Sequence, residues 1–253
     1  MTLNILKDFL DPTILSSFAF LIFVLIILFY TLRKIKIIKT SDNKSINKTK
    51  FFLITLFVLL IWFFAVVFFG KIRFFSKNYY WLFVPNIIIG FLVLFELLRR
   101  VYYSKTIQII TDKIPQHWII GVQFYRIVGV GFIVLWTRGI LPAAFAFSAG
   151  IGDMFIGLTA PFVAYLYYKN KPYSRKLAII WNYLGILDLI IALSIGVLGF
   201  PRPVQFLSLS PNTEPLSLFP LVIIPLFAVP LAILLHLFSL RGLRNGGAKK
   251  PNI

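Results

Sequence analysis

Long apolar runs separated by short polar and basic stretches dominate this chain. A helix that crosses the hydrocarbon core of a bilayer needs about 20 predominantly apolar residues. Each run of that length therefore predicts a spanning helix, and the runs cover residues 14–32, 51–70, 80–98, 118–137, 149–168, 177–199 and 219–240. The pattern predicts an all-α integral membrane protein: a seven-transmembrane-helix bundle that forms a single membrane domain over residues 1–253.

Composition supports the bilayer as the solvent of this protein. Hydrophobic residues make up 59% of the chain and charged residues 13%, whereas charged residues are about a quarter of a typical soluble domain. Charge this sparse leaves too little polar surface to cover a soluble globule. The chain has no cysteine, which excludes disulfides, thiol nucleophiles and thiolate metal sites.

The Lys and Arg residues predict an orientation in the membrane. The segments that follow the first, third, fifth and seventh apolar runs are all more basic than the segments between them. Cytoplasmic loops carry the excess of Lys and Arg, so we expect the N-terminus outside and the C-terminus in the cytoplasm of a cell-membrane protein. This distribution also accounts for the net charge of +18. Nucleic acid is not an expected partner, because the basic residues do not gather on one face.

Ionisable residues inside the predicted spans are the first candidates for function. A charge at the bilayer centre costs about 2.5–3.5 kcal/mol or more and normally faces the bundle interior with a partner. Arg126 lies near the middle of the fourth span, Asp188 in the middle of the sixth, and Asp153 about one turn into the fifth. We expect Arg126 to pair with Asp188, with Asp153 as a second candidate partner nearer the outer surface.

Helical spacing places other polar and small residues beside these charges. At about 100° per residue, one stripe of the fourth span contains Gln123, Arg126, Val130 and Thr137. On the sixth span, Asn182 shares a stripe with Asp188. Small residues let helices approach closely, so we expect the fourth to sixth helices to meet along faces that include Gly157, Ala160, Ala164, Gly185, Ala192 and Gly196. The candidate ligand-binding or ion-pair residues are Gln123, Arg126, Asp153, Asn182, Asp188 and His236.

One pair of residues and one segment each have two interpretations. Glu96 and His236 lie near predicted cytoplasmic helix ends and either form a proton relay or, the reading we favour, each reach the interface. Residues 139–152 form either a re-entrant segment beside Asp153 or a hydrophobic surface turn, with Ser148 as the N-cap of the fifth helix.

Motifs of known enzymes are missing from the chain. It has no Walker loop, no Gly-x-Ser-x-Gly and no His-Glu-x-x-His, the patterns that mark nucleotide, esterase and zinc chemistry. Its two histidines, His117 and His236, are too few for a typical catalytic zinc site. We therefore expect no catalytic residue, no metal and no cofactor.

Several stretches of the C-terminal half are similar to a known group of proteins. The stretches are QFYRIVGVGF, LPAAFAFSAGIGD, GLTAPFVA, WNYLGILD and FPLVIIPLFAVPLAILLHLFSL. Together they resemble uncharacterised multi-pass membrane proteins found in many prokaryotes. The resemblance implies a multi-pass membrane protein and no particular activity.

Three functional hypotheses follow, in decreasing order of preference. The first is a small-molecule or ion binding and transport protein, with Arg126 as an anion anchor and the aspartates as counter-charges or proton carriers. The second is an accessory or scaffold subunit that docks other membrane subunits through its apolar surface, with the ion pair as a structural lock. The third is an intramembrane enzyme acting on a lipid-like substrate, ranked last because an aspartate beside Arg126 is a weak general base.

Overall fold

The computed structural model describes residues 2–34, 47–76, 78–79, 84–201 and 206–244. These residues are almost entirely helical, which confirms the predicted all-α class. Short turns and loops join the helices, and the described residues also include two antiparallel two-residue strands, β1 (Asn78–Tyr79) and β2 (Val84–Pro85).

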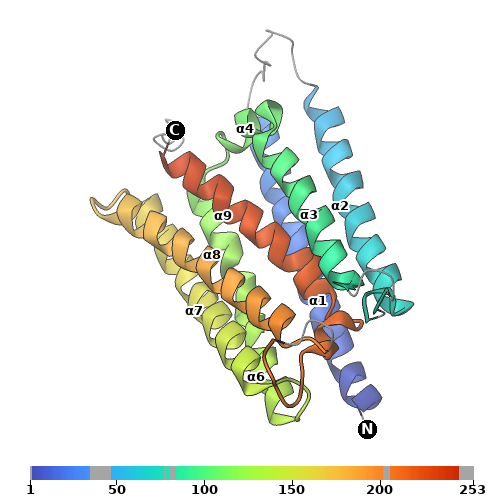
Figure 1. Cartoon of the computed structure of the whole chain (residues 1–253). Coiled ribbons are helices and arrows are strands. Elements are labelled where there is room, and N and C mark those ends of the chain that lie inside the picture. Colours follow the sequence, from blue (N-terminus) through green and yellow to red (C-terminus); the bar gives the residue numbers. More distant parts are fainter. Residues whose placement is uncertain (1, 35–46, 77, 80–83, 202–205, 245–253) are drawn as a thin grey trace.

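The helices follow the apolar runs along the chain (Figure 1). The α-helices are α1 (Thr2–Lys34), α2 (Lys48–Lys71), α3 (Asn86–Tyr103), α4 (Lys105–Thr111), α5 (Gln116–Gly121), α6 (Val130–Thr137), α7 (Ala143–Tyr168), α8 (Ser174–Leu198) and α9 (Val229–Arg244). Three 3₁₀ helices, η1 (Phe74–Ser76), η2 (Val122–Gly129) and η3 (Glu214–Ser217), and one π-helix, η4 (Ile224–Ala228), complete the described elements.

Within the described residues, five helical segments are long and apolar enough to cross a membrane. They are Lys48–Lys71, Gln116–Thr137, Ala143–Tyr168, Ser174–Leu198 and Ile224–Arg244. The second of these joins α5, η2 and α6, and the last joins η4 and α9. The protein is therefore a helical membrane protein by length and composition, and α1 and α3 lie alongside these five segments (Figure 1).

Two predicted boundaries were wrong. α1 begins at Thr2 rather than at residue 14 and continues through Pro12, because prolines are tolerated within membrane helices. α7 begins at Ala143 after Pro142 at the N-cap, so most of residues 139–152 is helix and Ser148 lies inside it. The chain turns at Gly139, where φ is +68°, and the alanines that follow favour helix.

Packing centres on α7 in the half of the bundle that holds the candidate site. α7 contacts η2, α6 and α8, and α8 in turn contacts α9. On the other side of α9 lie α3, α1 and α2 (Figure 1). A buried apolar cluster joins α1, α2 and the start of the last span through Phe20, Phe63, Val222 and Phe227.

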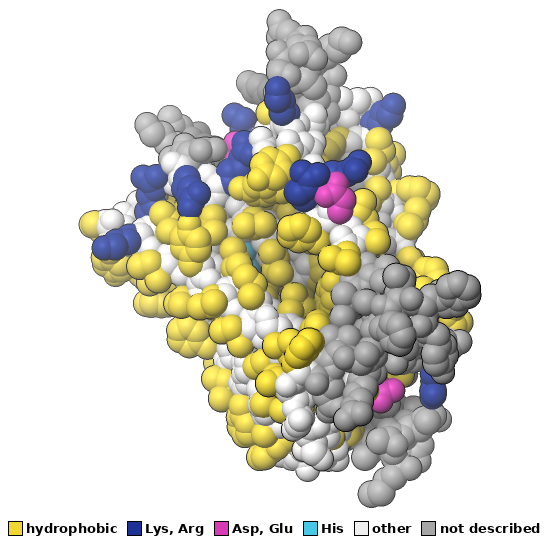
Figure 2. Space-filling view, in the orientation of Figure 1, with side chains coloured by type: hydrophobic (Ala, Val, Ile, Leu, Met, Phe, Trp, Pro, Cys, Tyr) yellow, Lys and Arg dark blue, Asp and Glu magenta, His cyan; other side chains and the backbone are white. Residues whose placement is uncertain are grey.

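The outer surface is apolar around the middle of the molecule and basic at one end. Side chains such as Phe57 and Phe64 on α2 and Phe162 on α7 are more than half exposed, as expected for residues that face lipid. Most of the visible Lys and Arg side chains lie toward the end of the molecule where α9 ends (Figure 2).

Candidate ligand site around Arg126

Arg126 lies in a 3₁₀ segment in the middle of a membrane-crossing helix. η2 spans Val122–Gly129, whereas 3₁₀ runs longer than 3–4 residues are uncommon and often mark a hinge or strain. Side chains three apart are eclipsed in a 3₁₀ helix, so Gln123 and Arg126 point the same way and both are buried. The stripe drawn at α-helical spacing was wrong at Thr137, which is exposed and bonds to the Val134 carbonyl.

The guanidinium of Arg126 joins both predicted aspartates. Its Nε donates to Asp153 Oδ1 at 2.7 Å, and its Nη2 donates to Asp188 Oδ2. The Arg126 side chain is 1% exposed and each carboxylate side chain 15%. The structure thus brings three helical segments, η2, α7 and α8, together at one buried ion cluster, in which both Asp153 and Asp188 pair directly with Arg126.

His236 completes the cluster from α9. Its Nε2 lies 3.2 Å from Arg126 Nη1, and its Nδ1 lies 2.9 Å from Asn182 Oδ1. A guanidinium only donates, so Nε2 accepts and carries no proton. The Asn182 amide nitrogen donates to the Ala178 carbonyl and to Ser239 Oγ, which leaves Oδ1 to accept from Nδ1–H. The hydrogen bonds therefore assign a neutral imidazole protonated on Nδ1.

Glycines allow the four segments to approach closely around these charges. A Cβ on Gly157 of α7 would lie 2.6 Å from the backbone nitrogen of Ile127 in η2. A Cβ on Gly185 of α8 would lie 2.5 Å from the imidazole of His236. Both positions were expected on close-packed faces. Gly129 and Gly152, which lie against Asp153 and Asp188, were not among the expected positions.

Gln123 and Glu96 do not join the cluster. Gln123 is buried, and its amide donates to the Ala232 carbonyl of α9 at 3.3 Å. Glu96 pairs with Arg99 and Arg100 on its own helix, so no relay links it to His236. His236 does not reach the interface. It is 1% exposed, and α9 continues for two more turns beyond it to Arg244.

A cavity of about 320 Å³ adjoins the cluster. Arg126 and Asp153 supply the charges in its lining, and Ser16, Ser17 and Tyr125 supply hydroxyls. Aliphatic and aromatic side chains form the remaining wall. The contribution of α1 was not predicted, although the paired serines in its otherwise apolar span were an available signal. Small-molecule sites are typically mostly apolar cavities with a few placed polar groups, and this cavity fits that description.

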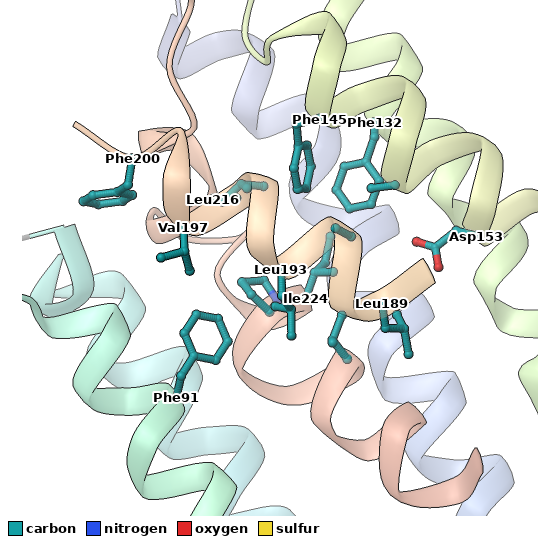
Figure 3. A pocket seen from close by; sticks show the side chains of 15 residues that line it. Phe91, Phe132, Phe145, Asp153, Leu189, Leu193, Val197, Phe200, Leu216 and Ile224 are labelled. Atoms are coloured by element: carbon teal, nitrogen blue, oxygen red, sulfur yellow. The ribbon is translucent and has the colours of Figure 1, made fainter. Parts of the chain in front are cut away.

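A second, smaller cavity of about 40 Å³ touches Asp153 from another direction. Figure 3 shows Asp153 at one end of it, Phe91 and Phe200 at the other, and the α8 residues Leu189 and Leu193 between them. Among the described residues of this lining, Asp153 is the only charged one. One carboxylate therefore borders both cavities.

Trp181 is a further neighbour of the cluster that the sequence did not single out. Its indole N–H donates to Thr159 Oγ1 at 2.8 Å, and its ring centroid lies 5.3 Å from that of His236. It covers the imidazole from the α7–α8 side. Its position one residue before Asn182 was the signal available.

The formal charges of the cluster do not cancel. Arg126 contributes one positive charge, Asp153 and Asp188 contribute two negative charges when ionised, and His236 is neutral. The described cluster therefore carries a net charge of −1 with both aspartates ionised, and one proton or one monovalent cation neutralises it. Charges at this depth are costly unless compensated.

Comparison with known proteins gives one family. A model of a domain of unknown function (DUF8737) matches residues 82–244. That range contains Arg126, Asp153, Asn182, Asp188 and His236, and it extends beyond the C-terminal half to include α3. No curated protein and no solved structure matches the chain. Because the family model covers well over half of the sequence, the chain belongs to this family, the domain of unknown function DUF8737.

Proposed function

We propose that this protein binds a small molecule or ion inside the membrane and transports it, at the cluster of Arg126, Asp153, Asp188 and His236. The observation that carries the proposal is the position of the cluster against a cavity of about 320 Å³. A structural lock alone needs no such space, and a tightly packed apolar replacement is often as stable as a buried ion pair. Intramembrane charges that border a cavity are typical of substrate or ion pathways.

The arrangement of the segments supports an alternating mechanism. The cluster joins η2, α7, α8 and α9, and η2 is a long 3₁₀ segment of the kind that often acts as a hinge. A change of charge at Asp153 or Asp188 alters the ion pairs that hold η2 to α7 and α8. Ligand binding and the relative position of these helices are then coupled through Arg126.

We further propose that the chain crosses the cell membrane seven times, with α1 and α3 as the two additional spans and the C-terminus in the cytoplasm. α1 and α3 run alongside the five apolar segments (Figure 1), and the described part of α1 includes the apolar stretch Ala19–Arg33. The basic residues gather at the end where α9 ends (Figure 2), in agreement with the tendency of cytoplasmic loops to be basic.

A scaffold role is the second candidate, favoured by the bare surface of α2. Three residues of this 24-residue helix are buried, namely Phe63, Val66 and Gly70, while Phe57, Phe64 and Phe68 are each 58% exposed or more. Either lipid or another membrane subunit covers this face. The scaffold reading predicts a partner that remains bound in mild detergent and a cluster that binds no ligand.

Ligand-dependent thermal unfolding of the purified protein tests the transport proposal. A panel of inorganic ions and small cationic, anionic and neutral compounds is added to the intact chain in detergent. A ligand that binds only the native state raises the unfolding temperature, with a stabilisation of about 2.7 kcal/mol at 100 times its Kd. Hits are then assayed for uptake into proteoliposomes.

Two variants and a control locate the effect. Asp188→Asn removes one charge of the cluster, and Ala228→Leu fills the cavity that Ala228 lines. Asp112→Asn removes a carboxylate that pairs with Arg241 outside the site. We expect the stabilisation to disappear in the first two variants and to persist in the third. If no compound stabilises the protein, or if all three variants respond alike, the proposal fails and the scaffold role replaces it.

A further inference from the structure

We infer that the ligand of the large cavity is a small organic cation, a compound with one ammonium group and a short apolar body. The inference deepens the proposed function and rests on it. It departs from the expectation that Arg126 anchors an anion. Three features of the cavity carry it: the use of the Arg126 donors, the free oxygen of Asp153 and the character of the wall.

The guanidinium of Arg126 has little left to offer an anion. It has five N–H donors, and four contacts direct them at Asp153, Asp188, His236 Nε2 and the Gly185 carbonyl. An anion needs donors and an uncompensated positive charge. Two carboxylates already outweigh the single charge of Arg126, so a second anion in the cavity would be repelled.

Asp153 offers a hydrogen-bond acceptor at the cavity, whereas the N–H donors of Arg126 are already directed at other groups. Its Oδ1 accepts from Arg126, and its Oδ2 has no hydrogen bond within the part of the chain that the structure describes. Oδ2 lies next to Gly129, since a Cβ on Gly129 would be 3.0 Å from it. Gly129 and Asp153 both line the large cavity. The hydroxyls of Ser16 and Ser17 in the same lining are further acceptors for ammonium N–H groups.

The wall and the volume point to an organic cation rather than a proton or a bare metal ion. Tyr125, Phe132, Leu189 and Leu221 line the cavity and suit a hydrocarbon body. A volume of about 320 Å³ greatly exceeds the roughly 30 Å³ share of one water molecule. A small inorganic cation prefers a shell of oxygen ligands, which this largely apolar lining does not supply.

The charge balance of the cluster also favours a positively charged ligand. An ammonium group near Asp153 brings the net charge of the cluster from −1 to zero. The cavity also lies away from the basic end of the protein, since most of its residues come from the first half of α1, from η2 and α6, and from the start of the last span. Repulsion of a cation by the Lys and Arg residues at the basic end is therefore weaker in the cavity than beside those residues.

Probes of equal chain length but different charge test the sign of the ligand's charge. Unfolding temperatures of the purified full chain are measured with butylammonium, 1-butanol and butanoate, and with butyltrimethylammonium, whose charge does not depend on a proton. We expect both ammonium compounds to stabilise the protein at concentrations at least ten-fold lower than the alcohol or the carboxylate. Equal or stronger stabilisation by butanoate or butanol would overturn the inference.

Variants tie the effect to Asp153 and to the cavity. Asp153→Asn makes the cluster neutral, with Arg126 still paired to Asp188, and should weaken butylammonium binding at least ten-fold. Ala228→Leu reduces the cavity volume without touching the ion pairs and should abolish binding. It provides the test if Asp153→Asn proves too unstable to measure. Asp112→Asn should bind like the unaltered protein. Unchanged affinity in Asp153→Asn or Ala228→Leu would contradict the assigned site.

The outcomes separate this inference from the proposed function. If butanoate or butanol stabilises the protein as strongly as butylammonium or more strongly, and Ala228→Leu prevents this, the protein is a small-molecule binder and the cationic ligand class is wrong. If no probe and no compound of the wider panel binds, the proposed function itself is wrong.

Discussion

The cluster around Arg126 depends on residues with no side chain as much as on the charged ones. Gly157 lets α7 lie directly against the backbone of η2 beside Arg126, and Gly185 makes room for the imidazole of His236. A methyl group at either place would collide with backbone or with a fixed ring. The ion pairs are therefore short because the helices are close, and the helices are close because these positions are glycine.

We predict that Gly157→Ala destabilises the protein by about 1–3 kcal/mol, the usual cost of overpacking. The added Cβ would lie 2.6 Å from the Ile127 backbone nitrogen, which cannot move without shifting η2. Gly121→Ala is the matched control, because its Cβ meets Ala164 at an ordinary 3.8 Å. Thermal unfolding in detergent is the measurement. Equal unfolding temperatures for the two variants would show that η2 adjusts freely.

At this residue scale the sequence predicted the participants better than their contacts. Arg126, Asp153 and Asp188 stood out because charges inside apolar runs are costly and normally paired. That Asp153 pairs with Arg126 as well as Asp188, and that His236 is buried beside them, depends on where four helices cross. Distances along one helix do not contain that information.

Among the elements, the start of the last span shows how prolines are accommodated. In an α-helix the nitrogen of residue 230 would donate to the carbonyl of Leu226, but Pro230 has no N–H. The indole of Trp62 on α2 donates to that carbonyl at 2.9 Å. Tyr125 and Gln123 similarly donate to the carbonyls of Ala228 and Ala232. Neighbouring helices thus donate to two carbonyls of the π-helix η4 and to one in the first turn of α9.

We predict that Trp62→Phe destabilises the protein by about 1–3 kcal/mol, the cost of a buried polar group without a partner. Leu226 is 1% exposed, so water does not readily replace the indole. The control is Trp136→Phe, at the end of α6, where the side chain is 38% exposed and the change should stay within about 0.5 kcal/mol. Chemical or thermal unfolding of the three proteins compares them. If Trp62→Phe left the stability to unfolding unchanged, another donor would have to reach the Leu226 carbonyl.

Element types were less predictable than element positions. The apolar runs located the long helices because burial in lipid requires about the same length whatever the local helix type. The 3₁₀ geometry of η2 and the π geometry of η4 have no counterpart in hydropathy. They arise from tertiary contacts with α7, from the prolines, and from donors on other helices.

Across the whole molecule, the segments that connect the helices alternate between strongly basic and weakly basic. The turn after α6 holds Arg138, whereas the turn after α7 holds Lys169 and Lys171. The proposed seven-span topology would place these two turns on opposite sides of the membrane, with Arg138 outside and Lys171 in the cytoplasm. The absence of cysteine from the chain makes single introduced cysteines clean reporters of side.

We predict that a membrane-impermeant maleimide labels Arg138→Cys on intact cells and labels Lys171→Cys only after the membrane is permeabilised. Both residues are exposed, so reactivity reports the side of the membrane rather than burial. The reverse pattern would invert the orientation. Labelling of both positions in intact cells would show that α7 does not cross.

The sequence by itself determined that this is a helical membrane protein, where its apolar helices lie along the chain, and which charged residues lie inside them. Those properties follow from the energy of single segments in lipid, which depends on local composition. Only the tertiary structure decided that Asp153 and Asp188 share one arginine, that His236 and Asn182 extend the cluster, and that α1 closes a cavity beside it. These features depend on crossing angles and close approaches between segments far apart in the chain, and side-chain packing between helices sets them.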